Sequence, residues 1–253
     1  MIANNKIINT DENINEEMLE NTKERIIELS QRLKKTDKPV FIELTGTPKS
    51  GKTTLKRALE ESLSKYGIDV YTRRETAEYN PINKSDEHYD IWMILELFKN
   101  ISEDLSKKNG QVIIYDRGIL DRIPWMKLGV EKESLTKSDF KKLTSLYSMK
   151  KFDGYSPITK IFETSPKLSV QRQGKPGFFV NEKNVGMYNE FLKESLSQIQ
   201  HHSSYSSYTI TDVYQGNMKS FIIDNTNDII DGINKELDRR ATIEKAEDRQ
   251  LEF

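Results

Sequence analysis

Gly46-Thr47-Pro48-Lys49-Ser50-Gly51-Lys52-Thr53 fits the pattern G-x-x-x-x-G-K-[ST] of a phosphate-binding P-loop. The segment 40–45 before it is suited to a strand, and the residues from Lys52 to Tyr66 are suited to a helix. A tight glycine turn between a strand and a helix points backbone N–H groups and the positive helix end at one spot. This stretch therefore predicts a site for the phosphates of a nucleotide; the alternative is an accidental glycine turn.

Individual residues of the loop have separate expected roles. Gly46 and Gly51 permit the turn, because a Cβ would block the backbone conformation or crowd the phosphates. Lys52 would supply a cation to the outer phosphates, and the Thr53 hydroxyl would ligate Mg²⁺. We therefore expect ATP and Mg²⁺ as cofactors. The residues predicted to hold the nucleotide in this loop are Gly46, Thr47, Pro48, Lys49, Ser50, Gly51, Lys52, Thr53 and Thr54.

The composition is polar and nearly neutral. Of the 253 residues, 35% are hydrophobic and 31% are charged, and the formal net charge is −1. This balance offers no general attraction for nucleic acid or an anionic membrane. No apolar run approaches the roughly 20 residues of a spanning helix, and the start of the chain does not read as a secretory signal. Cysteine is absent, which excludes disulfides and agrees with the reducing cytoplasm expected for this protein.

Three parts are expected along the chain: an N-terminal helical extension (1–37), a P-loop domain (38–238) and a charged C-terminal tail (239–253). Apolar residues at a loose three-to-four spacing predict a helix between Asn13 and Lys35 with one buried face. We expect this helix to pack on the main domain; a partner-binding or dimerising helix is the alternative. The tail is expected to be a solvated helix or a frayed end.

The main domain alternates expected strands with helices. Strands are expected at 40–45, 68–72, 111–115, 157–162, 208–213 and 221–224, and Asn225 or Thr226 is expected to cap a last helix. The short apolar run at 111–115 fits a buried central strand of a parallel sheet. This order predicts an α/β protein with a three-layer P-loop NTPase fold, in which helices flank a mainly parallel sheet.

Polar residues cluster at 73–81, where the second strand ends. In open α/β sheets, ligands sit beyond the carboxyl ends of the strands. Glu75 and Glu78 are therefore candidates for activating an acceptor hydroxyl. Arg73 and Arg74 are candidates for binding an anion, and a solvated loop with ordinary ion pairs is the alternative.

Two segments have both a structural and a functional interpretation. N-K-x-D at 83–86 is the guanine-reading motif of GTPases, but it lies too early in the chain for that role. We interpret it as a helix start, with Ser85 or Asp86 as N-cap. Trp125 and Met126 are candidates for the wall of an acceptor pocket, and core packing is an equal alternative.

The third strand ends in Asp116-Arg117-Gly118. An acid that closes a buried strand beside a P-loop is in the usual place for a second contact to Mg²⁺ or its water. Arg117 could hold a phosphoryl group through paired N–H bonds. A structural ion pair is the alternative for Asp116 and Arg117.

Three marks occur in order: the P-loop at 46–54, Arg74-Glu75, and Tyr115-Asp116-Arg117-Gly118. Together they resemble the P-loop nucleoside and nucleotide kinases, a group with deoxynucleoside kinases, thymidylate kinases and ribosylnicotinamide kinase-like domains, over about residues 39–238. In deoxynucleoside kinases a glutamate after the second strand is the general base, and Glu75 matches that place without the E-P-V context. Their E-R-S segment corresponds to Asp116-Arg117-Gly118, with Asp for Glu and Gly for Ser.

The resemblance also implies a lid around 171–180, a basic stretch that contains glycine. Cations of such a lid stabilise charge on the transferring phosphoryl group, and closure keeps water away. Arg172 and Lys175 are the residues predicted for this role. A basic surface loop is the alternative.

These features predict a kinase that moves the γ-phosphate of ATP to a small acceptor, a nucleoside or nucleotide. Glu75 would be the base for a neutral hydroxyl, and Thr53 and Asp116 would hold Mg²⁺. The predicted catalytic residues are Lys52, Glu75, Asp116, Arg117 and Arg172. The alternatives are a regulatory ATPase or switch that acts through a protein partner, and a polynucleotide 5′-kinase, which the near-neutral charge disfavours. A homodimer is left open.

Overall fold

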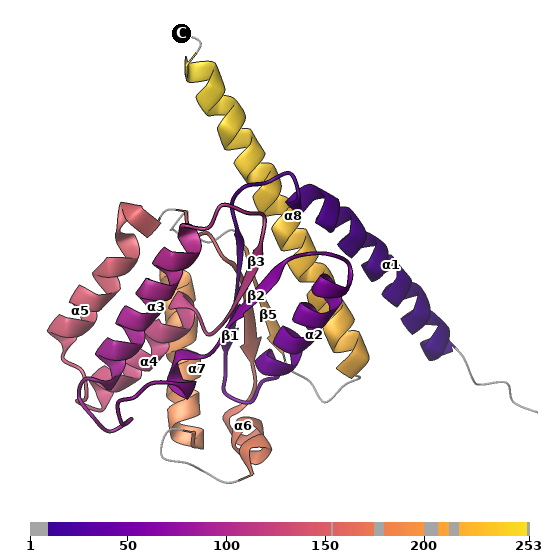
Figure 1. Cartoon of the computed structure of the whole chain (residues 1–253). Coiled ribbons are helices and arrows are strands. Elements are labelled where there is room, and N and C mark those ends of the chain that lie inside the picture. The colour runs from indigo at the N-terminus through magenta and orange to yellow at the C-terminus, as the bar shows by residue number, and fades with distance from the viewer. Residues whose placement is uncertain (1–9, 153, 175–179, 200–206, 213–217, 252–253) are drawn as a thin grey trace, which may run out of the picture.

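The computed structural model describes residues 10–152, 154–174, 180–199, 207–212 and 218–251 (Figure 1). Its centre is a five-stranded sheet with strand order β2-β3-β1-β4-β5. All neighbouring strands are parallel. The strands are β1 (Val40–Gly46), β2 (Val70–Arg73), β3 (Val112–Asp116), β4 (Ile158–Glu163) and β5 (Ser207–Asp212). The predicted α/β fold with a parallel central sheet is therefore confirmed.

Helices cover both faces of this sheet, as Figure 1 shows. The face with α1, α2 and α8 receives Val40, Ile42 and Leu44 of β1, whereas Phe41 points to the face with α3, as expected from the alternation of side chains along a strand. The helices are α1 (Thr10–Leu33), α2 (Lys52–Lys65), α3 (Tyr89–Leu105), α4 (Ile119–Glu131), α5 (Lys137–Ser145), α6 (Pro166–Gln173), α7 (Glu182–Ile199) and α8 (Met218–Leu251), and short 3₁₀ turns occupy Thr76–Glu78, Leu146–Ser148 and Lys150–Phe152.

Helix α1 packs along α8, as the sequence predicts for a helix with one apolar face. Ile26, Leu29 and Leu33 of α1 are buried in the same cluster as the inner residues of β1. Polar contacts join the two helices at their rim: Arg32 Nη1 donates to Asn234 Oδ1 over 2.7 Å, and Arg25 Nη1 donates to Asn227 Oδ1 over 2.8 Å. The apolar face of α1 is thus part of the core of the molecule.

The end of the chain differs from the sequence-based prediction. The expected strand at 221–224 is wrong, because α8 begins at Met218 and continues to Leu251. Asn225 and Thr226, the two expected N-caps, both lie inside this helix. The Nδ2 of Asn225 donates to the carbonyl oxygen of Phe221 over 2.7 Å. A short apolar run fits a strand and a buried helix equally well. Here the helical spacing of later buried residues, such as Ile229 and Ile233, decides for the helix.

The start of α3 also differs. The helix begins at Tyr89 with His88 as N-cap, so the prediction of Ser85 or Asp86 as N-cap is wrong. Asn83 Oδ1 accepts a hydrogen bond from Ser85 N over 3.1 Å, and Asp86 Oδ1 accepts one from His88 N over 2.9 Å. Side chains that satisfy nearby backbone groups in this way favour turns over helix, and they delay the helix by several residues.

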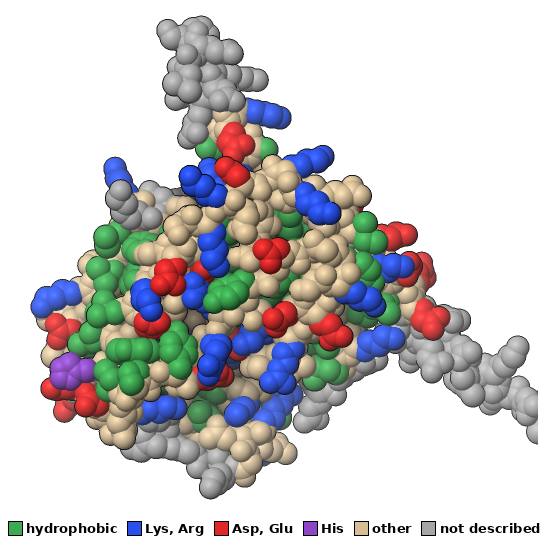
Figure 2. Space-filling view, in the orientation of Figure 1, with side chains coloured by type: hydrophobic (Ala, Val, Ile, Leu, Met, Phe, Trp, Pro, Cys, Tyr) green, Lys and Arg blue, Asp and Glu red, His purple; other side chains and the backbone are tan. Residues whose placement is uncertain are grey.

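The surface mixes charges of both signs. On the face seen in Figure 2, basic and acidic side chains are interspersed, in agreement with the net charge of −1. Among the helices that the structure describes, none is both long enough and apolar enough to cross a membrane.

Candidate active site

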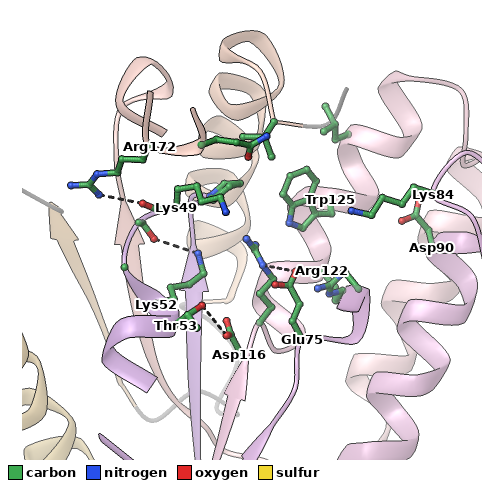
Figure 3. A pocket seen from close by; sticks show the side chains of 18 of the residues that line it. Lys49, Lys52, Thr53, Glu75, Lys84, Asp90, Asp116, Arg122, Trp125 and Arg172 are labelled. Carbon is green, nitrogen blue, oxygen red and sulfur yellow. Dashed lines mark hydrogen bonds and ion pairs between the residues drawn. The ribbon is translucent and has the colours of Figure 1, made fainter. Parts of the chain in front are cut away.

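A cavity of about 840 Å³ opens beyond the carboxyl ends of β1 and β3 (Figure 3). Strand β1 has β3 on one side and β4 on the other, so the direction of the crossovers reverses beside it. Ligands of open α/β sheets bind at such a point. The cavity is lined by the P-loop and by residues of α3, α4, α6 and α8, and Glu75 lies at its wall.

The P-loop connects β1 to α2 with an unusual backbone. Gly46, Lys49 and Gly51 have φ angles of 126°, 60° and 97°, in the region where glycine is favoured. A Cβ on Gly46 would lie 2.0 Å from the carbonyl oxygen of Phe162 in β4. The need for glycine at position 46 therefore comes from the neighbouring strand as well as from the turn.

Lys52 is buried at the first position of α2. Its ammonium donates to the carbonyl oxygens of Gly46 (2.9 Å) and Thr47 (2.7 Å) and to Ser50 Oγ (3.3 Å). Burial and the nearby charge of Arg117 lower the pKa of Lys52 to about 7. A phosphate chain beside the loop would add negative charge near this ammonium and favour its protonated form.

Thr53 and Asp116 meet at the expected place for Mg²⁺. Thr53 Oγ1 donates to Asp116 Oδ2 over 3.3 Å, and the carboxylate is 3% exposed. A hydroxyl and a carboxylate are the hard oxygen ligands that Mg²⁺ takes alongside waters and substrate phosphates, so the residues present fit this ion. Lys56, which the sequence reasoning missed, places its Nζ 2.9 Å from the same Asp116 oxygen.

Arg117 links the two halves of the site. It has a φ angle of 69°, and its Nε lies 2.9 Å from Glu75 Oε1 while its Nη1 lies 2.9 Å from Asp121 Oδ2. Although burial opposes its charge, Asp121 and Glu75 hold the pKa of Arg117 well above its ordinary value. Its Nη1 also lies 3.5 Å from the carbonyl oxygen of Gly46, so the guanidinium contacts both the P-loop and Glu75.

Asp121 is a fully buried acid of this region, and no role was predicted for it. Its Oδ1 accepts from Gly46 N over 3.2 Å and from Tyr188 Oη over 2.6 Å, and its Oδ2 accepts from Trp125 Nε1 over 3.1 Å. Burial opposes its charge, but Arg117 and its other cationic neighbours lower the pKa of Asp121. This carboxylate therefore ties the P-loop to α4 and α7.

A second buried acid lies beneath the turn into α4. Glu43 of β1 accepts from Ile119 N over 2.6 Å and from Tyr155 Oη over 2.7 Å. Burial raises the pKa of Glu43 to about 7. A Cβ on Gly118 would lie 1.9 Å from Glu43 Oε1, so the carboxylate fills the space of a side chain at position 118. The only sequence signal for this role is a glutamate within an apolar strand.

The other predicted side chains separate into two groups. Trp125 lines the cavity, whereas Met126 is buried in the core. Arg73 forms an ion pair with Asp104. The Nε of the exposed Arg74 lies 3.6 Å from Glu78 Oε2. None of Arg73, Arg74 and Glu78 lines the cavity.

The lid prediction falls partly on described residues. Arg172 of α6 lines the cavity, and its Nη1 donates to the carbonyl oxygen of Lys49 over 3.2 Å. Lys175 lies outside the described residues. The predicted site residues that line the cavity are Pro48, Lys49, Ser50, Gly51, Lys52, Thr53, Thr54, Glu75, Asp116, Arg117 and Arg172; Gly46 and Thr47 lie buried beneath them.

Sheet order, P-loop and cavity together define a P-loop nucleoside kinase-like fold. Solved structures with this fold include deoxyadenosine kinase from M. mycoides with bound dCTP, which has 19% identity and a TM-score of 0.53 over 75% of this chain and 98% of that chain. The same kinase with its products dCMP and dCDP gives 18% identity and a TM-score of 0.54 over 77% and 100% of the two chains. These identities establish the likeness of fold alone.

Other comparisons add less. NadR in complex with NR has 17% identity and a TM-score of 0.49, over 78% of this chain and 49% of that chain. No protein-family model matches the chain, and no curated protein matches it.

Proposed function

We propose that this protein is an ATP-dependent kinase that transfers the γ-phosphate to a hydroxyl group of a nucleoside. The observation that supports this most directly is the pairing of Glu75 with Arg117 at 2.9 Å in the same cavity as the P-loop. A carboxylate beside a phosphate-binding loop can accept a proton from a hydroxyl that attacks the γ-phosphorus. The solved structures with this fold include a deoxyadenosine kinase.

In the proposed reaction, the backbone N–H groups of the P-loop and the ammonium of Lys52 hold the phosphate chain of ATP. The acceptor oxygen forms a bond to the γ-phosphorus while the bond from that phosphorus to the bridging oxygen breaks. The electron pair leaves with ADP, and the proton of the hydroxyl moves to Glu75. Mg²⁺ bound at Thr53 and Asp116 would offset the charge of the phosphates.

Two arginines have complementary roles in this proposal. Arg117 orients the Glu75 carboxylate through their ion pair and adds positive charge near the transferring phosphoryl group. Arg172 reaches the P-loop from α6 at the Lys49 carbonyl oxygen, 3.2 Å away, and would add a cation from the lid side. The contribution of Lys175 stays a prediction.

The test is a transfer assay with ATP labelled at the γ-phosphate and a panel of nucleosides and monophosphates. Glu75→Gln should lower nucleoside turnover by roughly 10²–10⁴-fold, because a general base contributes that much, while ATP affinity stays within about twofold. Glu78→Gln is the matched control, since Glu78 is half exposed and pairs with Arg74 outside the cavity.

Each result has a definite meaning. Unchanged turnover in the Glu75→Gln variant would refute the base role. Release of labelled phosphate without any labelled acceptor, together with a protein partner whose binding follows nucleotide state, would replace the proposal with the regulatory ATPase alternative.

A further inference from the structure

Arg122 carries an unsatisfied hydrogen-bonding edge in the acceptor half of the cavity. It follows Asp121 on α4, lines the cavity and is only 6% exposed. Neither Nε nor Nη2 has a hydrogen-bond partner among the described residues. The Asp121 carboxylate oxygen near Nη2 is 4.0 Å away, which is too long for a hydrogen bond. Figure 3 places Arg122 beyond Glu75 as seen from the P-loop.

The two unpartnered nitrogens form one side of the guanidinium. The N–H bonds of that side run nearly parallel, so they suit two adjacent acceptor atoms of one ligand. Leaving a buried cation without these bonds is costly. A ligand that supplies two neighbouring acceptors would remove that cost. The unpartnered side of the guanidinium therefore suits ligand binding.

Asp90 supplies the opposite kind of group in the same cavity. It lies in the first turn of α3 and lines the cavity, and the nearby charge of Arg122 opposes the rise in the pKa of Asp90 that burial causes. Gly129 of α4 leaves room for it, since a Cβ there would lie 3.1 Å from Asp90 Oδ2. An ionised carboxylate only accepts hydrogen bonds, so Asp90 suits a ligand that offers donors.

We propose that Arg122 and Asp90 read the base of the acceptor, and that this base is a 6-oxopurine, as in guanosine. This rests on the proposed nucleoside kinase function. Guanine offers the adjacent acceptors O6 and N7 to an arginine, and it offers N1–H and the 2-amino group to a carboxylate. Adenine would place its 6-amino group, a hydrogen-bond donor, opposite the donors of Arg122, so the two could not bond. Cytosine satisfies the arginine through O2 and N3 but leaves the carboxylate a single amino group.

A phosphate group is the other ligand that suits a bidentate arginine. Cations such as Lys84 and Lys132 line the cavity beside Asp90 and Glu75, so charge alone does not separate a phosphate from a neutral base. The Asp90 carboxylate accepts hydrogen bonds and donates none, and a phosphate dianion likewise has no donor to offer it. The pairing of a donor edge on Arg122 with an acceptor on Asp90 therefore favours a base, which carries both kinds of group, over the phosphate of a nucleoside monophosphate. The monophosphate becomes an outcome of the test.

The first experiment measures binding of nucleosides to the full chain by calorimetry, without ATP. Guanosine should bind at least about tenfold more tightly than adenosine or cytidine, since one bidentate arginine contact discriminates by roughly ten- to hundredfold. 7-Deazaguanosine, which lacks the N7 acceptor, should bind several-fold more weakly than guanosine. Equal affinity for guanosine and 7-deazaguanosine, binding of no nucleoside, or binding of guanosine monophosphate alone would overturn the inference.

The second experiment uses Arg122→Met, with Lys127→Met as matched control. Lys127 lies on the same helix, pairs with Glu194 at 3.0 Å and does not line the cavity. Arg122→Met should lose roughly ten- to hundredfold in guanosine affinity and all discrimination against 7-deazaguanosine, with adenosine affinity unchanged. An equal loss for every nucleoside would show a structural role instead.

The two proposals fail separately. If guanosine binds with this selectivity but no labelled product forms, the kinase proposal is wrong and the base-reading inference stands. If adenosine is phosphorylated as well as guanosine and Arg122→Met leaves their ratio unchanged, the kinase proposal stands and the base-reading inference is wrong.

Discussion

Replacing Arg73 by methionine should lower the free energy of unfolding of the protein without impairing ligand binding at the candidate site. Arg73 closes β2, and its Nε and Nη2 donate to the two carboxylate oxygens of Asp104 over 2.9 Å and 2.7 Å. Asp104 is fully buried, and the Arg73 side chain is 15% exposed. The variant therefore leaves a buried carboxylate without its bidentate partner.

The size of the effect follows from what remains around Asp104. Removing one partner of a buried ion pair costs about 3–5 kcal/mol. Tyr115 Oη still donates to Asp104 over 2.6 Å, and Lys107 Nζ still lies 2.9 Å away. We therefore expect the lower end of that range, about 3 kcal/mol in the free energy of unfolding.

Urea denaturation of the wild type and the variant measures this difference. The double variant Arg73→Met with Asp104→Asn should recover at least about 1 kcal/mol relative to the single variant, because it removes the unpaired charge. Acceptor KM should stay within about twofold. A loss under about 1 kcal/mol together with a tenfold rise in acceptor KM would show that Arg73 binds ligand and that this reasoning is wrong.

Two further predictions concern pH. Burial raises the pKa of Glu43 from 4.5 to about 7. The stability that this group contributes is therefore present below pH 4.5 and is lost as the pH rises to about 7. Over that window, the free energy of unfolding of the Glu43→Gln variant should rise by up to about 3 kcal/mol relative to the wild type in denaturation curves. The lowered pKa of Lys52, about 7, means that ATP binding should take up a proton above pH 7. ATP affinity should then fall by up to about tenfold per pH unit; calorimetry in two buffers that shows no proton uptake at pH 8 would contradict this.

The parts of the candidate site that are contiguous in the chain could be predicted from the sequence. Residues 46–54 contain the loop, the cation and the hydroxyl in one run, and the apolar strand before Asp116 marks that acid as the end of a buried β3. Glu75 was found because the end of β2 borders the same crevice. These inferences need only local pattern and the rule for strand ends.

The remainder depends on which segments become neighbours. Arg73 appears as a free cation in the sequence, but its partner Asp104 lies 31 residues later and meets it only when α3 packs against β2 and β3. Asp121 and Arg122 are adjacent in the chain, yet one holds the P-loop and the other faces the acceptor side. The extent of α8 was missed because its first apolar residues fit either kind of element.

Glu43 and Gly118 have a consequence for how relatives of this protein can differ. A side chain at position 118 needs the volume that the Glu43 carboxylate fills, since a Cβ there would lie 1.9 Å from Glu43 Oε1. A serine introduced at position 118 would therefore require a shorter residue at position 43. We expect the two positions to covary among homologues, and a graft of the E-R-S segment into this scaffold to need both changes at once.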